Sequence, residues 1–300
     1  MEQPTEAPVP RYDRDELLGR GTFASVYGLS SHTVVKKILK DGMDKVLHVR
    51  EEEAMRRMDH PNVLKLIGVA EDNDFKYLVL ERCMGTVKDY ITGDKKFDEM
   101  PPEVEALRQM ANGLAYIHSQ EVVHRDIKPA NVLISSGFVL KIADFGCCKP
   151  TAPDGSMSVT SGPKGTKTYF APEYLRLEVE NVTAEERKNI RADKSIDIFS
   201  LGCLFFTYIV NKGIHIHLFA TPGRTFKLSE SYESKVANNI LSDKKFMEEN
   251  GMPRGHYAFE MIDGMTQALS KNRWPLEDGE PGINSVLGTI NTELQRQQSQ

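Results

Sequence analysis

The amino-acid sequence predicts an α+β protein with two lobes, a small β-rich lobe followed by a larger, mainly α-helical lobe. Three observations support this prediction. Short strand-like runs and a single helical stretch occupy the first part of the chain, and the pattern becomes mainly helical beyond about residue 100. The length of 300 residues suits one large domain or two packed lobes. The hydrophobic content of 40% is ordinary for a globular protein.

The strands of the small lobe are predicted from β-branched and apolar runs. VVKKIL at 34–39 and YLVLE at 77–81 both read as strands bounded by turn signals. Between them, the stretch 45–58 has apolar residues at helical spacings. HPN at 60–62 ends this helix, and a further strand is expected over 63–70.

The large lobe begins with a helix over 101–120. Two prolines suit its first turn. Apolar residues then recur on one face, namely Val104, Leu107, Ala111, Leu114 and Ile117. We predict further helices at 195–210 and 257–270, and loop-rich structure at 176–194 and 211–240.

Composition argues against several classes of function. The net charge of −5 and the pI of about 6.0 lack the basic character of nucleic-acid-binding domains. The longest apolar run, Leu201–Val210, is about half of the ~20 residues that span a bilayer, and no secretory signal is evident. The four cysteines are too few and too irregularly spaced for a disulfide framework or a zinc site. We therefore expect that the protein has neither a nucleic-acid nor a membrane partner. We also expect its cysteines to be free thiols and its location to be cytoplasmic or nuclear.

Five motifs occur in a fixed order. They are GRGTFASV (19–26), HRDIKPAN (124–131), LKIADFG (140–146), GTKTYFAPE (165–173) and DIFSLG (197–202). With these motifs the chain resembles the eukaryotic protein kinases from about residue 18 to residue 273, and HRDxKxxN, DFG and APE at such spacings are highly specific. The first motif departs from G-x-G-x-x-G-x-V because Ala24 replaces the third glycine.

The resemblance implies a domain organisation. It places a protein kinase domain at 14–290, with an N-lobe at 14–81, a hinge at 82–85 and a C-lobe at 86–290. We expect a disordered lead at 1–13 and a polar, frayed tail at 291–300. The motifs are also similar to the kinase part of the unfolded-protein-response kinase–ribonucleases. Only 27 residues follow Arg273, so we expect no ribonuclease module.

The resemblance implies catalytic roles for four residues. Asp126 would accept or orient the proton of the attacking hydroxyl, and Lys128 would offset charge on the γ-phosphate of ATP. Lys128 in this pattern favours serine and threonine over tyrosine substrates. Asn131 and Asp144 would supply oxygen ligands to Mg²⁺, which prefers such hard donors.

A lysine in the strand at 34–39 is expected to anchor ATP. When this strand is aligned with the corresponding strand of the family, the anchoring lysine is Lys36. Because side chains alternate along a strand, Lys37 should then point to the opposite face. The ion-pair partner should be Glu51, although Glu52 and Glu53 are its immediate neighbours and remain alternatives.

The nucleotide pocket follows by the same mapping. Gly19 and Gly21 would line the phosphates, Val26 and Val34 would lie above the adenine ring, and Leu133 below it. The backbone of Glu81 and Cys83 would bind the ring edge, and Leu80 would close the back of the pocket. Aliphatic residues at these spacings are more often plain core, and here we expect them to be both core and pocket wall.

The segment between Asp144 and Glu173 is expected to control activity. Glu173 should pair with a buried arginine, for which Arg273 is the candidate. Arg125 would bind a phosphate on this segment, added between Ser156 and Ser161 by an upstream activating kinase. Thr166 is expected to contact the catalytic loop, which is the HRDIKPAN stretch at 124–131, instead of serving as a switch.

The sequence thus predicts an ATP- and Mg²⁺-dependent serine/threonine protein kinase that acts on protein hydroxyls. The alternative is a nucleotide-binding scaffold of the pseudokinase type, suggested by Ala24, Val34 and the divergent region 211–285. A small-molecule kinase of related fold is a third option, which the APE segment disfavours because that segment builds a platform for a protein substrate.

Overall fold

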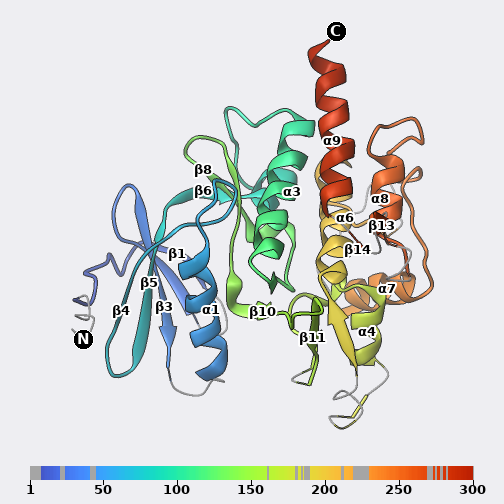
Figure 1. Cartoon of the computed structure of the whole chain (residues 1–300). Helices are drawn as coiled ribbons and strands as arrows, with labels where there is room; N and C mark the ends of the chain where they lie inside the picture. Colours follow the sequence, from blue (N-terminus) through green and yellow to red (C-terminus); the bar gives the residue numbers. More distant parts are fainter. Residues whose placement is uncertain are drawn as a thin grey trace.

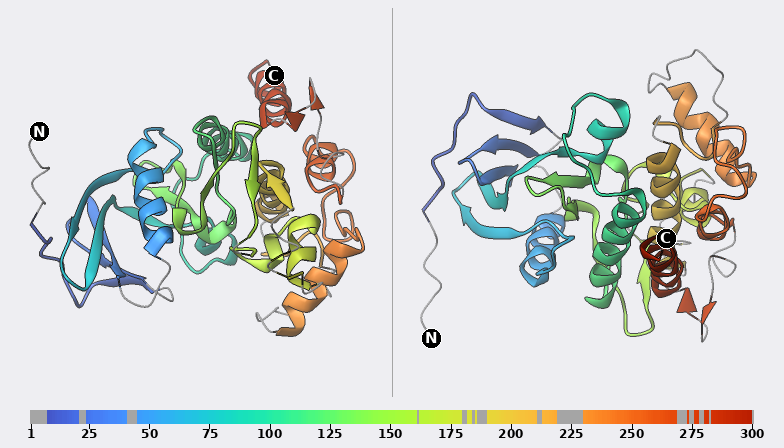
Figure 2. Two further views of the ribbon diagram at one scale, coloured as in Figure 1. Left: turned by 60° about the horizontal axis from the view of Figure 1, so that its bottom comes forward. Right: turned by 90° about the horizontal axis from the view of Figure 1, so that it is seen from above.

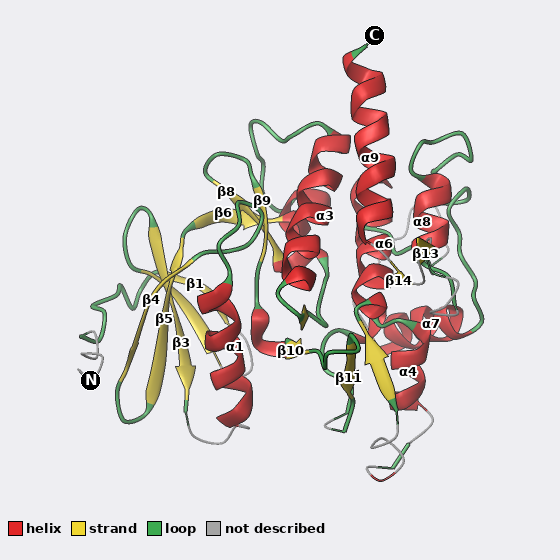
Figure 3. Ribbon diagram, in the orientation of Figure 1, coloured by secondary structure: helices red, strands yellow, loops and turns green. Residues whose placement is uncertain are grey.

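The two predicted lobes are present in the computed structural model, which confirms the α+β fold class. Strands gather in the N-terminal lobe and helices in the C-terminal lobe (Figures 1 and 3). The structure describes residues 8–20, 24–40, 45–160, 162–179, 182–183, 185, 190–210, 213–218, 230–268, 273, 276–277, 280–281 and 283–299.

A five-stranded antiparallel sheet forms the N-terminal lobe. Its strands, in the order β1-β2-β3-β5-β4, are β1 (Leu17–Arg20), β2 (Ala24–Gly28), β3 (Thr33–Leu39), β5 (Phe75–Glu81) and β4 (Leu66–Glu71). The strand expected from residue 63 begins at Leu66. Val63 and Leu64 instead pair with Ile142 of the other lobe, so this stretch links the lobes.

Helix α1 (Lys45–Arg57) agrees with the predicted helix and lies against one face of this sheet (Figure 2). Ala54, Met55 and Met58 are buried there in the same core as Ile38 and Leu78. On the same side of the helix, Glu51 reaches a lysine of β3 and Glu52 a lysine of β5.

Aromatic side chains cover the opposite face of the sheet. Tyr77 is buried there, and Tyr12 packs on Tyr27 with ring centroids 4.9 Å apart. Lys37 stacks on Phe75, 3.7 Å from the ring centroid, so it points away from α1 as predicted. Tyr12 belongs to the expected disordered lead, but its ring contacts this aromatic face, which a purely local reading could not foresee.

The connection between the lobes is a strand, β6 (Cys83–Thr86), followed by α2 (Val87–Thr92). Strand β6 pairs with β8 (Val132–Ser135), which pairs with β9 (Leu140–Ile142). The Thr86 hydroxyl accepts from the backbone N–H of Asp89, whose carboxylate accepts from the N–H of Thr86, and this capping box starts α2. The hinge segment therefore lies directly beside the strands that flank the catalytic motifs.

Helix α3 (Glu103–Ser119) follows Pro102, which agrees with the predicted proline start. The five apolar residues predicted on one face are all buried. Helix α9 (Ile283–Gln298) runs alongside α3 (Figure 1) and buries Ile283, Val286 and Ile290. The polar C-terminal tail is therefore helical through Gln298 as the end of α9, where the sequence predicted a frayed end.

Helix α6 (Ser195–Val210) matches its predicted bounds and is buried from Ser195 to Tyr208, which explains its unbroken apolar sequence. Helix α8 (Phe259–Met265) is shorter than predicted. Helices α4 (Pro172–Val179) and α7 (Glu230–Leu241) reach into segments expected to be loops. The short strands β13 (Leu276–Glu277) and β14 (Glu280–Pro281) pair between α8 and α9.

No helix among the described ranges combines the length and the apolar character that crossing a lipid bilayer requires.

Candidate active site

The carboxylate of Asp126 is held by three side chains from two segments. Lys128 Nζ and Asn131 Nδ2 donate to Oδ2 at 2.7 and 2.8 Å, and the Thr166 hydroxyl donates to Oδ1 at 2.8 Å. Lys128 Nζ also donates to Thr166 Oγ1 at 2.7 Å, which confirms the predicted contact of Thr166 with the catalytic loop. Asp126 is only 7% exposed, so this network orients a nearly buried carboxylate.

The catalytic loop lies between β7 (Val122–Val123) and β8 and contains a short 3-10 turn, η1 (Pro129–Asn131). Arg125 has a φ of 69°, a conformation that costs a non-glycine residue about 1–3 kcal/mol. The surrounding hydrogen bonds must hold this strained backbone in place.

Asp197 at the start of α6 supplies those bonds. Its fully buried carboxylate accepts from the backbone N–H of His124 at 2.7 Å and of Arg125 at 2.8 Å, and it contacts His118 Nε2 at 2.9 Å. Burial alone would raise the pKa of Asp197, but the bond from His118 and the charges nearby lower it. The motif DIFSLG by itself indicates no role for Asp197. An acidic residue in an otherwise apolar helix was the available signal, because a buried charge needs partners.

Lys36 of the N-terminal lobe binds two carboxylates, one from each lobe. Its Nζ lies 2.6 Å from Glu51 Oε1 and 2.9 Å from Asp144 Oδ1. Burial would lower the pKa of Lys36, but Glu51 and Asp144 raise it, so the lysine stays charged. The Lys36 charge holds the pKa of Asp144 at about 2, well below its usual range. The predicted pair of Lys36 with Glu51 is therefore present, and Glu51 rather than Glu53 is the buried member.

Asp144 and Asn131 fit a bound Mg²⁺ by their chemistry. The Asp144 side chain is 49% exposed and ionised, and Lys36 binds only one of its two oxygens. Both hydrogen bonds of the Asn131 amide nitrogen go to Asp126, which leaves the amide oxygen of Asn131 as a donor for a cation. Mg²⁺ commonly takes one or two protein oxygens and completes its shell with water and phosphate.

The residues expected around the adenine ring converge at the lobe boundary. Val34 and Leu80 face each other across β3 and β5 and are buried, and Val26, Leu133 and Cys83 pack partly buried against the same core. The Glu81 carboxylate binds Lys141 Nζ at 3.0 Å and the backbone N–H of Lys65 at 2.7 Å, so the side chain braces the hinge. The structure thus brings the predicted wall residues together, and their contacts with a nucleotide stay a prediction.

The glycine-rich motif spans the β1–β2 hairpin. Gly19 pairs with Val26, and Gly21 lies outside the described residues. Ala24 opens β2 opposite Ile38 and is not among the residues with positive φ. Position 24 therefore does not require the conformational freedom of glycine. On this count, alanine can replace the third glycine of the motif without straining the backbone.

The segment from Asp144 to Glu173 is packed onto the C-terminal lobe. After the short turn η2 (Phe145–Cys147), β10 (Lys149–Pro150) pairs with β7, and β11 (Ser156–Ser158) pairs with β12 (Arg191–Asp193). The Arg125 guanidinium donates to the carbonyl of Cys147 at 2.5 Å and lies within 3.4 Å of Cys148 O and Tyr174 Oη. Arg125 is thus already engaged with backbone carbonyls of this segment.

The end of this segment approaches the catalytic loop closely. Gly165 has a φ of 117°, and a Cβ at this position would lie 2.2 Å from the Arg125 carbonyl oxygen. Only glycine fits there, because any side chain would push the segment away from Asp126. Thr166, the next residue, then reaches Asp126, and the turn η3 (Lys167–Tyr169) leads into α4.

Glu173 pairs with Arg273 as predicted. Arg273 Nη1 lies 2.5 Å from Glu173 Oε1, and its Nη2 binds the other carboxylate oxygen. The guanidinium is 0% exposed and also donates to the carbonyl of Gln267 at 3.0 Å. This arginine therefore joins α4 to the end of α8.

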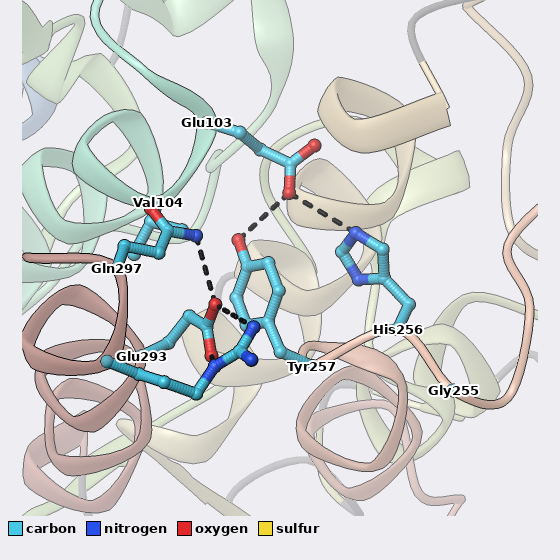
Figure 4. A pocket seen from close by; sticks show the side chains of 8 residues that line it. Glu103, Val104, Gly255, His256, Tyr257, Glu293 and Gln297 are labelled. Carbon is cyan, nitrogen blue, oxygen red and sulfur yellow. Dashed lines mark hydrogen bonds and ion pairs between the residues drawn. The ribbon is translucent and has the colours of Figure 1, made fainter. Parts of the chain in front are cut away.

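A pocket lies at the opposite end of α3 from the catalytic loop (Figure 4). None of the predicted site residues lines it. Glu103 binds Tyr257 Oη at 2.9 Å and His256 Nε2 at 3.3 Å, and Glu293 binds Arg296 Nε at 2.8 Å. Because these charged side chains bind one another, we place the functional site at Asp126 and not at this pocket.

Comparison with known proteins agrees with the geometry. The family model described as protein kinase domain matches residues 12–278. The chain is 32% identical over 220 residues to serine/threonine-protein kinase/endoribonuclease ire-1 of Caenorhabditis elegans, covering 68% of this chain and 21% of that protein. The identity to the human kinase/endoribonuclease IRE2 is 34% over 218 residues, or 68% of this chain and 22% of the relative.

A second group of relatives carries the names PLK1 and PLK4. The chain is 31% identical over 244 residues to serine/threonine-protein kinase PLK1 of Xenopus laevis, covering 78% of this chain and 37% of that protein. The chain therefore spans between about a fifth and somewhat over a third of the length of these curated relatives.

Proposed function

This chain belongs to the eukaryotic protein kinase family and is similar to its serine/threonine-specific members, and on that premise we propose that it transfers the γ-phosphate of ATP to serine and threonine hydroxyls of proteins. The arrangement around Asp126 is the observation that carries the proposal. A threonine hydroxyl already donates to Asp126 Oδ1 at 2.8 Å, so a substrate hydroxyl has a suitable acceptor at the same carboxylate.

The roles of the other residues follow from the charges that phosphate transfer must neutralise. Lys36, held by Glu51, would bind phosphates of ATP, and Lys128 would face charge on the transferred group. Asp144 and Asn131 would hold Mg²⁺, which would neutralise phosphate charge when bound. All five side chains are present, and this intact set does not favour the pseudokinase alternative.

Transfer of labelled phosphate from ATP tests the proposal directly. Purified protein, first treated with phosphatase that is then removed, should phosphorylate itself or a generic serine/threonine substrate in the presence of Mg²⁺. Chelation with EDTA should stop the transfer, and added Mg²⁺ should restore it. A protein that binds ATP and Mg²⁺ but transfers no phosphate would contradict the proposal and support a scaffold.

We further propose that phosphorylation between Ser156 and Ser161, by an upstream kinase or by the chain itself, tunes this activity. Ser158 and Thr160 have hydroxyls 3.1 Å apart beside β11, and Lys149 Nζ donates to the Ser158 carbonyl. A phosphate in this region would lie near that cation and would strengthen the contacts that order the segment. Ser161 lies outside the described residues.

We also propose a cytoplasmic or nuclear location, because all four cysteines are free.

Alanine at Ser156, Ser158, Thr160 and Ser161 together is expected to lower kcat severalfold, because the segment loses its phosphate. Phosphatase treatment of the wild type should have the same effect, and mass spectrometry should locate the phosphate. Ser242→Ala, which changes an exposed serine at the end of α7, is the control and should leave the rate unchanged. Full activity in the fourfold variant would contradict this regulation.

A further inference from the structure

Two consecutive glutamates of α1 bind lysines on two different strands. Glu51 binds Lys36 of β3 at 2.6 Å, and Glu52 Oε2 binds Lys76 Nζ of β5 at 2.5 Å. In the sheet register Lys36 lies opposite Leu78, and Lys76 lies opposite Ile38. Since residues two apart in a strand share a face, both lysines point to the face on which α1 lies.

The ion pair of Glu52 with Lys76 is almost as buried as that of Glu51 with Lys36. The Lys76 and Glu52 side chains are 13% and 17% exposed, compared with 15% and 4% for Lys36 and Glu51. Arg56, one turn along α1, also binds Glu52, with Nε 2.8 Å from Oε1. Burial would raise the pKa of Glu52, but the bonds from Lys76 and Arg56 lower it, so the glutamate stays charged.

We propose that Glu52 and Lys76 are positioning residues that set the rotation of α1 on the sheet and so bring Glu51 to Lys36. This inference rests on the proposed kinase function. Neighbouring residues of an α-helix point about 100° apart around its axis, so the two pairs hold the helix from two directions. A rotation that releases Glu51 must also move Glu52 away from Lys76.

The ion pair between Lys36 and Asp144 shows why the rotation of α1 matters. Lys36 Nζ is 2.9 Å from Asp144 Oδ1, so Lys36 keeps a partner if α1 turns away. The Asp144 carboxylate would then compete with the phosphates of ATP for Lys36, and Glu51 would no longer orient the lysine. The contact between Glu52 and Lys76 favours the state in which Glu51 remains engaged.

An ordinary surface ion pair is the alternative interpretation. Pairs of that kind contribute little, and their loss would not change nucleotide binding specifically. The pair of Glu52 with Arg56 within α1 fits this description, since Arg56 is 56% exposed. Lys76 differs because it belongs to another element and is sheltered.

Lys76→Met and Glu52→Gln test the proposal. We expect each to lower kcat/KM for ATP by about 5- to 20-fold, mainly through a higher KM, because Glu51 is engaged for less of the time. The double variant should be no worse than the more affected single variant, since both changes remove the same contact between Glu52 and Lys76. Lys76→Arg keeps the charge and should stay within about threefold of the wild type.

Glu53→Gln is the matched control for Glu52→Gln, because Glu53 is the exposed neighbour on the same helix. It should change neither the kinetics nor the amide exchange of α1. Hydrogen exchange over residues 50–57 gives a readout that needs no phosphate transfer, and it should accelerate in Lys76→Met but not in Lys76→Arg.

The outcomes separate the two proposals. If the wild type transfers no phosphate but the exchange of α1 responds as expected, the kinase function fails and the positioning role stands. If the exchange and KM for ATP in Lys76→Met match the wild type, the positioning role is wrong. An equal loss of global stability in Lys76→Met and Lys76→Arg, with KM unchanged, would likewise overturn it.

Discussion

Asp144→Asn is expected to lower kcat for phosphate transfer by at least about 100- to 1000-fold while the protein stays folded. Asp144 is half-exposed, and its pKa of about 2 keeps it charged at neutral pH. An amide has nearly the same shape but no charge, so it should bind Mg²⁺ poorly and lose the ion pair with Lys36. The site would keep its geometry and lose the charge that the chemistry needs.

Steady-state kinetics with purified protein, together with a denaturation curve, would measure this effect. Asp74→Asn is a matched control, because Asp74 is an exposed aspartate in the N-terminal lobe outside the site. It should retain the wild-type rate. An Asp144→Asn variant that keeps a tenth or more of the wild-type kcat would show that Asp144 does not hold the metal.

Arg273→Met is expected to reduce the free energy of unfolding by about 3–5 kcal/mol. Methionine fills part of the space of the arginine stem but leaves the Glu173 carboxylate without its cation. The guanidinium is fully buried and also lies over Phe199, with Cζ 5.2 Å from the ring centroid. Removing it would leave the partly buried Glu173 carboxylate without its cation and would loosen α4 from α6 and α8.

Chemical denaturation of wild type and variant would give this difference. Arg254→Met is the control, since Arg254 and Glu248 form a pair whose side chains are 74% and 49% exposed. We expect this variant to lose less than about 1 kcal/mol. A loss of similar size in Arg273→Met would mean that burial of the pair contributes little to the fold.

Several parts of the site could be predicted from residues alone. Alternation along β3 separates Lys36 from Lys37, and the structure places them on opposite faces of the sheet. The contact of Thr166 with the catalytic loop was predicted from the motif that contains Thr166, and the structure shows it at Lys128 and Asp126. The first feature depends on local backbone geometry, and the second was predicted from the family motif.

Other parts could not be predicted because distant segments decide them. The sequence predicted Glu51 as the partner of Lys36 and kept Glu52 and Glu53 as alternatives, and only the packing of α1 on β3 and β5 gives Glu51 and Glu52 different partners. Asp197 reaches the catalytic loop from the start of α6, 73 positions beyond His124, and no local pattern indicates that contact. The helix α9 also continues through a polar end, because its other face packs against α3.

The two-lobed fold class, the family resemblance and the residue types that phosphate transfer requires can all be predicted from the amino-acid sequence. Periodicity and motif spacing carry that information, because they reflect local backbone geometry and the charges that the chemistry must neutralise. The assembled fold is needed to show which glutamate meets which lysine, what holds the strained loop at Arg125, and where Tyr12 and helix α9 pack. Those choices depend on buried ion pairs and hydrogen bonds between segments far apart in sequence, whose energies exist only once the elements are assembled.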